Sequence, residues 1–227
     1  MYDTDGTATR EQMMSKIKAY TGDGITVHYE VARCIHAAEC VRGLPAVFDP
    51  QARPWIQPLR AAADEVVAAV ARCPTGALRV EHGGAGSAEA VPDHNEVRIV
   101  ADGPLYLRGD LELRAGDGTS LGRETRAALC RCGASQNKPY CDNSHVGVGF
   151  KDDGGCVAAH KSATAAAGPL VVTATANGPL QCDGPATLFD AFGDPAAAVQ
   201  QTWLCRCGQS ANKPYCDGSH RRVGFSA

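Results

Sequence analysis

The sequence of 227 residues has few aromatic side chains (6%) and nearly balanced charges, with 25 acidic against 22 basic residues. No block of Lys and Arg is present, so the footprint of a nucleic-acid-binding protein is missing. No run approaches the roughly eighteen apolar residues of a membrane-spanning helix. The N-terminus, Met1–Gly6, is acidic and polar, unlike a secretory signal or a transit peptide. We therefore expect a cytoplasmic protein that binds neither nucleic acid nor membrane.

Motifs of catalysis are also missing. The sequence has no Gly-rich phosphate loop after a strand and no G-x-S-x-G nucleophile elbow, so we do not expect an enzyme.

A secreted disulfide framework is equally unexpected. The number of cysteines is odd, eleven, and nine of them fall into clusters with metal-ligand spacing. The other two, Cys156 and Cys182, receive no role.

One segment occurs twice. Leu129–Phe150 and Leu204–Phe225 are identical at 17 of 22 positions, and each carries the pattern C-x-C-x8-C-x3-H. The similarity begins earlier, because residues 97–105 align with 172–180 at the same offset. Each repeat is thus predicted to contain a strand, a Gly-Pro turn, a second strand and a ligand loop. The candidate metal ligands are Cys130, Cys132, Cys141 and His145 in the first repeat, and Cys205, Cys207, Cys216 and His220 in the second.

The spacing of these residues has a physical meaning. Two cysteines separated by one residue lie on the same side of an extended segment, so both thiolates can face one metal. A cysteine and a histidine four positions apart lie on one face of a helical turn. Three thiolates and one imidazole suit zinc as well as an iron–sulfur cluster, and spacing alone does not separate the two.

The turn before each histidine also has recognisable features. Asn143 and Gly218 occupy equivalent positions and are the residue types that best tolerate a positive φ, which predicts a left-handed residue there. Ser144 and Ser219 are candidates to cap the turn. In each repeat an arginine lies between the two cysteines of C-x-C, and the Asn-Lys-Pro segment further along the loop contains a lysine. We interpret these four cations as solvated charges: Arg131, Arg206, Lys138 and Lys213. Equivalent carboxylates, Asp142 and Asp217, are expected to hold the turn through local hydrogen bonds.

The run C-x-C-x2-S-x3-P-Y-C-D-G-S-H resembles the signature of the CDGSH (NEET) iron–sulfur family. The resemblance implies one [2Fe–2S] cluster per motif, with the two C-x-C cysteines on one iron and the third cysteine and the histidine on the other. Two motifs in one chain resemble the tandem branch of the family, a monomer in which the two copies replace the subunits of a dimer. Duplicated units usually pack about a pseudo-two-fold axis. Asn143 departs from the glycine of the motif.

A second constellation lies near the N-terminus. It contains Cys34, Cys40 and Cys73, the last followed by proline, as in bacterial ferredoxins. The position three after Cys34, where a ferredoxin has a cysteine, is Ala37. Residues 25–80 resemble the divergent monocluster ferredoxin-like domain. Three cysteines imply a [3Fe–4S] cluster, or a [4Fe–4S] cluster with another fourth ligand, for which His36 is the nearest candidate. The alternative is a domain that has lost its cluster and packs reduced cysteines.

These patterns give a domain plan and a fold class. We expect a polar lead-in (1–15), a ferredoxin-like domain (16–82), a linker (83–94), the first repeat (95–150), a second linker (151–168) and the second repeat (169–227). In the N-terminal domain, residues 16–20 and 25–29 should form a hairpin, 61–72 a helix and 78–80 a closing strand. The predicted class is α+β, a small ferredoxin-like domain followed by two β-rich units packed as a pseudo-two-fold pair.

The leading functional hypothesis is a multi-cluster iron–sulfur protein that acts in electron transfer, redox sensing or cluster transfer. Its partner would be a redox protein or an apo iron–sulfur acceptor protein. The alternative is a zinc-stabilised interaction module without redox activity.

Overall fold

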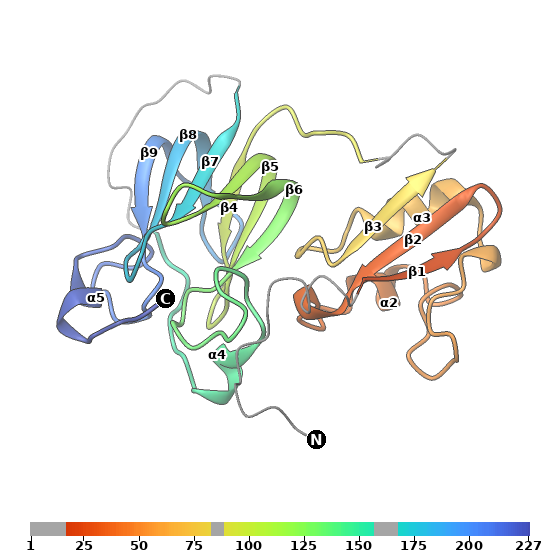
Figure 1. Ribbon diagram of the computed structural model, residues 1–227, viewed down its shortest axis with the longest axis horizontal. Coiled ribbons are helices and arrows are strands. Elements are labelled where there is room, and N and C mark those ends of the chain that lie inside the picture. The colour runs from red at the N-terminus through yellow and green to blue at the C-terminus, as the bar shows by residue number, and fades with distance from the viewer. Residues whose placement is uncertain (1–16, 83–88, 157–167) are drawn as a thin grey trace. The chain divides into compact units, whose positions relative to one another are not determined.

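The computed structural model describes residues 17–82, 89–156 and 168–227 (Figure 1). The predicted lead-in, 1–15, lies outside the described residues, as do 83–88 and 157–167 of the two predicted linkers. The chain divides into two compact units, with the boundary after Glu89. Each unit has its own hydrophobic core.

The N-terminal unit contains a three-stranded antiparallel sheet. Its strands are β1 (Ile17–Thr21), β2 (Ile25–Glu30) and β3 (Leu78–His82), in the order β1-β2-β3. The predicted hairpin and closing strand are confirmed. The hairpin turn contains Gly24 at φ 65°, a conformation that glycine adopts without strain. Alternate residues of β2 are buried, so one face of the sheet supplies Ile25, Val27 and Tyr29 to the core.

Short helical segments connect these strands. They are η1 (Val31–Arg33), α2 (Glu39–Gly43), η2 (Pro58–Arg60) and α3 (Ala63–Val70). Helix α3 confirms the predicted amphipathic helix. Its Val66 and Val70 are buried and its packing partner is β3. No helix in the described part of the chain is long and apolar enough to cross a membrane.

The C-terminal unit is built on a six-stranded sheet to which both repeats contribute three strands. The first repeat supplies β4 (Glu96–Ile99), β5 (Leu105–Ala115) and β6 (Ser120–Leu129), and the second supplies β7 (Leu170–Ala174), β8 (Leu180–Phe189) and β9 (Pro195–Leu204). The prediction of two strands per repeat is wrong, because β6 and β9 were missed. The exposed and half-buried residues at their starts hide the alternating pattern on which a strand prediction rests.

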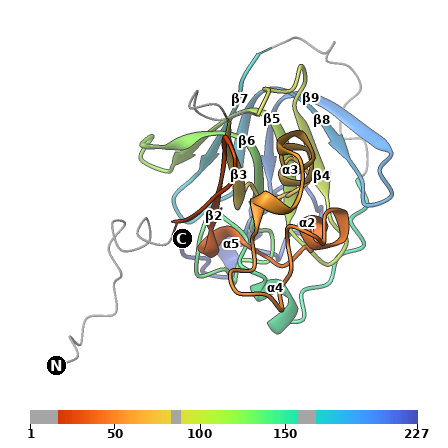
Figure 2. The same cartoon turned by 90° about the vertical axis from the view of Figure 1, so that its right-hand side faces the viewer.

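Strands of one repeat pair with strands of the other. Strand β4 runs parallel to β8, and β5 runs parallel to β7. The registers are reciprocal. Val97 pairs with Leu188, and the equivalent residues, Val172 and Leu113, pair in the same way. The ligand loops with α4 (Ser144–Gly147) and α5 (Ser219–Arg222) lie at the same end of this sheet (Figures 1 and 2).

Buried aliphatic side chains of both repeats form one continuous core. Leu105, Leu111, Leu170, Leu180 and Leu188 are all fully buried. Cys182 belongs to this core and is 1% exposed, and burial raises the pKa of its thiol to about 12. It therefore packs as a small apolar residue.

Asn95 ties the two repeats together at a bulge. Its Nδ2 donates to the carbonyl oxygens of Gly168 (2.9 Å) and Pro185 (2.7 Å), and its Oδ1 accepts from the backbone N–H of Asp110 (2.9 Å). Gly109, in the bulge of β5, approaches so closely that a Cβ there would lie 2.1 Å from Asn95 Oδ1. The regular secondary structure of the described residues is thus mostly β-strand with a few short helices, and the N-terminal unit precedes the two repeats.

Candidate metal centres

The first repeat brings its candidate ligands together in two pairs. The Sγ atoms of Cys130 and Cys132 are 3.7 Å apart, and Cys141 Sγ lies 3.4 Å from His145 Nδ1. Strand β6 ends at Leu129, so the C-x-C segment leaves the sheet directly. The loop then returns, because Cys141 donates its backbone N–H to Ala128 O (2.9 Å).

The second repeat reproduces this geometry. Cys205 and Cys207 have a sulfur–sulfur distance of 3.8 Å, and Cys216 Sγ is 3.3 Å from His220 Nδ1. In the described parts of the chain, no three or more His, Cys, Asp or Glu side chains are gathered closely enough to hold a single metal ion. The four distances given above join the eight candidate ligands two by two.

The turn that carries each histidine is left-handed at the predicted residue. Asn143 has φ 71° and Gly218 has φ 85°, which confirms the prediction and explains how asparagine replaces glycine. The prediction that Ser144 and Ser219 cap the turn is wrong. Both are the first residues of α4 and α5, and neither helix has a side-chain cap at its preceding residue.

Carboxylates hold these turns instead, as predicted. Asp142 accepts hydrogen bonds from the backbone N–H groups of Gln136 (2.7 Å) and Ser144 (3.0 Å). Asp217 accepts equivalent bonds from Ala211 and Ser219, both at 2.9 Å. Those bonds hold the pKa of Asp217 well below its usual range, since they stabilise the ionised form. Each aspartate thereby joins the two ends of its ligand loop.

Burial disfavours ionisation of most of the candidate ligands. It raises the pKa of the Cys141 thiol to about 11 and raises that of Cys216. Cys130 differs, because a hydrogen bond from the Cys132 thiol lowers its pKa to about 6. Burial also lowers the pKa of His145, an effect to which the nearby Arg131 contributes and which Asp142 opposes. The imidazole is therefore neutral near pH 7, the form in which it binds metals.

The arginines between the paired cysteines are not solvated, so that interpretation is wrong. Arg131 is 1% exposed and Arg206 is 3% exposed. Each donates to two carbonyl oxygens of its own repeat, Arg131 to Val100 and Gly103, and Arg206 to Thr175 and Gly178. Phenylalanine rings lie beneath them at 5.2 Å, Phe150 under Arg131 and Phe225 under Arg206. Because water is excluded from these positions, the electrostatic interaction of each buried guanidinium with neighbouring groups is strong.

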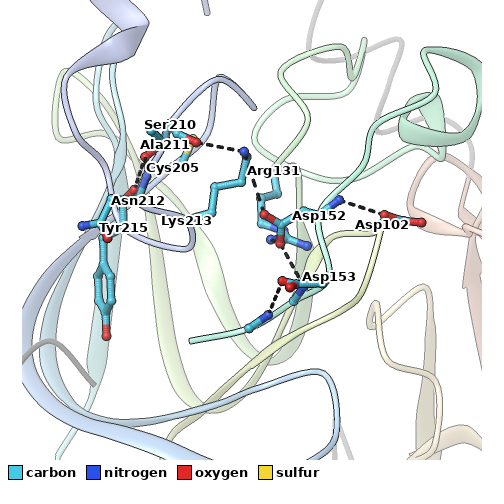
Figure 3. Close-up of polar contacts among 12 residues, drawn as sticks. Asp102, Arg131, Asp152, Asp153, Cys205, Ser210, Ala211, Asn212, Lys213 and Tyr215 are labelled. Carbon is cyan, nitrogen blue, oxygen red and sulfur yellow. Dashed lines mark hydrogen bonds and ion pairs between the residues drawn. The ribbon is translucent and has the colours of Figure 1, made fainter. Parts of the chain in front are cut away.

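Contacts of charged side chains also connect the two repeats. Asp152 forms an ion pair with Arg131 and lies 3.9 Å from Nζ of Lys213, which belongs to the second repeat (Figure 3). Lys138 of the first repeat lies over the ring of Phe225, with its Nζ 5.9 Å from the ring centroid. Both lysines are half-buried, so interpreting them as solvated charges is wrong as well. No sequence pattern singled out Asp152, although an alignment of the repeats places it opposite Ala227.

The two ligand loops meet backbone to backbone. Cys132 and Cys207 form an antiparallel bridge. Gly133 and Gly208 allow this approach. A Cβ at Gly133 would lie 2.7 Å from Cys207 O, and one at Gly208 would lie 2.7 Å from Cys132 O. The two candidate centres are therefore joined through their own ligand segments.

The N-terminal unit gathers its three cysteines at the edge of its core. Cys34 follows η1, Cys40 lies in α2 and Cys73 follows α3. Burial raises the pKa of Cys40 to about 11, and the charges of Cys73 and Cys34 add to this effect. Burial also raises the pKa of Tyr29, which is hydrogen-bonded to Cys34. His36 is exposed, at φ 56°, within the segment that joins Cys34 to Cys40.

Comparison with known proteins agrees with these centres. The family model described as "Divergent 4Fe-4S mono-cluster" matches residues 20–83, and "Iron-binding zinc finger CDGSH type" matches 102–146 and 177–221. Two curated relatives, both called "Uncharacterized protein YjdI", come from Escherichia coli strain K12 and Escherichia coli O157:H7. Each is 38% identical over 65 residues, which cover 29% of this chain and 86% of the relative. No solved structure matches the chain.

These matches define the class as an iron–sulfur protein, with three matched regions along the chain. The chain belongs to the CDGSH iron–sulfur family, as a tandem-repeat member with an N-terminal divergent 4Fe–4S mono-cluster domain that it shares with YjdI.

Proposed function

We propose that each repeat holds one [2Fe–2S] cluster, ligated by three cysteines and one histidine. The observation that carries this proposal is the arrangement of ligands in pairs. A binuclear cluster takes two protein ligands per iron, whereas zinc requires four ligands at about 2.0–2.3 Å from one ion. In the first repeat, Cys130 and Cys132 would bind one iron, and Cys141 and His145 the other. In the second repeat, Cys205, Cys207, Cys216 and His220 have the same roles.

The N-terminal unit would hold a third cluster, of the [3Fe–4S] or [4Fe–4S] type. Cys34, Cys40 and Cys73 are its proposed ligands, supported by their mutual electrostatic influence. His36 is the proposed fourth ligand if the cluster has four irons, since the segment that carries it connects two of the cysteines. An exposed imidazole in that segment can turn toward a cluster without leaving a buried contact.

The reciprocal registers of β4 with β8 and of β5 with β7 support a pseudo-two-fold arrangement of the repeats. Because each repeat completes the sheet of the other, we propose that the chain acts as a monomer that contains its own dimer.

We propose that the protein transfers single electrons to or from a partner redox protein in the cytoplasm. The clusters, when bound, supply this redox chemistry. The chain's residues bury four of the six repeat cysteines, keep His145 neutral and hold Arg131 and Arg206 in the segments between the paired cysteines. We propose that the protein is not an enzyme. Cluster donation to an apo acceptor protein and redox sensing are the other activities open to such centres.

Transfer and donation are separated by one experiment. The anaerobically purified protein is mixed with an apo-ferredoxin, and absorbance and circular dichroism are followed through a cycle of reduction by dithionite and reoxidation. An electron carrier cycles with its cluster spectrum intact, and its iron remains with it after gel filtration. A donor loses iron and sulfide to the apo-ferredoxin, which would contradict electron transfer as its main activity.

A further inference from the structure

The turns that carry the two histidines, α4 and α5, share a backbone but present different side chains to solvent (Figure 1). In both turns, the N–H of the residue after the histidine donates to the carbonyl oxygen of the left-handed residue, at 3.0 Å in α4 and 3.1 Å in α5. The second turn has Arg221 and Arg222 where the first has Val146 and Gly147. All four residues are exposed. The same backbone therefore offers a basic surface in one repeat and an apolar one in the other.

The arginines of α5 carry positive charge that the chain does not pair. No carboxylate in the described part of the chain forms an ion pair with Arg221 or Arg222. The acidic residue of this loop, Asp217, accepts hydrogen bonds from two backbone N–H groups. Nη2 of Arg222 donates to Oγ of Ser219 (3.0 Å), which fixes the guanidinium next to the residue that precedes His220. The turn thus has an excess of positive charge beside a candidate ligand.

Two more cations adjoin this turn through Phe225. The backbone N–H of Phe225 donates to His220 O (3.0 Å). Its ring lies 5.2 Å from the guanidinium of Arg206 and 5.9 Å from Nζ of Lys138, which belongs to the first repeat. Basic side chains of both repeats are therefore gathered around His220.

The α5 turn also lies on the less enclosed side of its centre. Cys205 and Cys207 are buried, whereas Cys216 and His220 are half-buried. Electron transfer between proteins slows steeply with distance. A partner that exchanges electrons with the second-repeat centre is therefore best placed on the side of Cys216 and His220, where Arg221 and Arg222 would contact it.

We propose that Arg221 and Arg222 form the docking surface for a redox protein whose own centre is surrounded by Asp and Glu side chains. Opposite charges steer such a partner toward α5 and orient it, and guanidinium groups bind carboxylates well. The exposed Val146 of the first turn offers it no charge. In the reducing direction, the reduced partner loses one electron, the second-repeat centre gains it, and no bond forms or breaks. This inference rests on the proposed function, because it requires a cluster in the second repeat.

The test uses the anaerobically purified full chain and, as the probe, a plant-type ferredoxin with an acidic surface. Surface plasmon resonance follows association with the immobilised ferredoxin, and stopped-flow absorbance follows electron transfer from the reduced ferredoxin. Both rates should fall as salt is added, because salt screens the attraction. The double variant Arg221→Gln/Arg222→Gln should associate about 3–10-fold more slowly at low salt and depend less on salt.

The first repeat supplies the converse variant. Val146→Arg/Gly147→Arg gives α4 the same pair of arginines, and a Cβ at Gly147 would have no atom within 4 Å. Association should become faster, since the chain then has two basic turns. Arg123→Gln is the matched control, because it removes an exposed charge near the start of β6, the end of the strand remote from the ligand loop. It should slow association far less than the double variant does.

Two results would overturn the inference. They are association that does not weaken as salt is added, and a double arginine variant that associates as fast as Arg123→Gln. Failure of the proposed function would give a different result, a preparation that contains zinc and no sulfide. The association rates need no cluster, so they would still show whether this surface binds an acidic protein.

Discussion

Cys132 and Cys207, 75 residues apart in the sequence, pair in an antiparallel bridge that joins the ligand loops of the two repeats. The contact places one candidate ligand of each centre in a single structural element. Loading of one centre should therefore fix the loop of the other, and damage to the bridge should affect both.

The glycines beside this bridge provide a direct test. Gly133→Ala or Gly208→Ala should destabilise the protein by about 1–3 kcal/mol, since the new Cβ meets a carbonyl oxygen at 2.7 Å and the residue has a positive φ. Urea unfolding with iron analysis measures the change. Gly118→Ala is the control, because Gly118 has φ 86° but no atom within 4 Å of an added Cβ. Equal losses in all three variants would show that strain at φ, and not the bridge, is responsible.

The histidine ligands should make the repeat centres labile in acid. Burial lowers the pKa of His145 in the folded protein, so as pH falls below its ordinary value of 6.5 the unfolded state takes up the proton first and stability is lost. The proton also competes directly with iron for the imidazole. His145→Cys and His220→Cys should slow the loss of visible absorbance between about pH 6 and 5 severalfold, because thiolates bind iron more firmly. Unchanged rates of loss in both variants would count against histidine ligation.

Asn95 should be essential for the packing of the two repeats. Asn95→Ala removes three part-buried hydrogen bonds, to Gly168 just before the second repeat, to Pro185 within it and to Asp110 of the first repeat. We expect a loss of about 2–4 kcal/mol in the free energy of unfolding. His94→Ala is the matched neighbour. Its ion pair with Glu96 is exposed, so the loss should stay below about 1 kcal/mol. Similar losses for the two variants would refute the cross-repeat role of Asn95.

The N-terminal centre is tested by iron content. Cys73→Ser should remove about three or four irons per chain and leave the two repeat centres loaded. His36→Ala distinguishes between the two proposed cluster types. It should convert a four-iron cluster to a three-iron form with a distinct paramagnetic signal, or leave the signal of a three-iron cluster unchanged. Loss of all iron in Cys73→Ser would mean that the units do not load independently.

The left-handed residue at 143 and 218 and the hairpin of the N-terminal unit could be predicted from the sequence, because each depends on local spacing or on a single residue type. The ligand assignment stays a prediction. The cross-repeat pairing of β4 with β8 was beyond such reasoning, since no local pattern specifies which distant strand lies alongside.

Arg131 shows the second limit. An arginine next to a cysteine is usually solvated, and its burial depends on acceptors at positions 100, 103 and 152, which only the tertiary fold assembles.

The presence of three iron–sulfur clusters in one chain is tested most directly by anaerobic purification with a visible spectrum and analysis of iron, sulfide and zinc. We expect red-brown protein with about seven or eight irons per chain and a similar amount of sulfide. Colourless protein with stoichiometric zinc and no sulfide would contradict it and leave a zinc-stabilised module in its place.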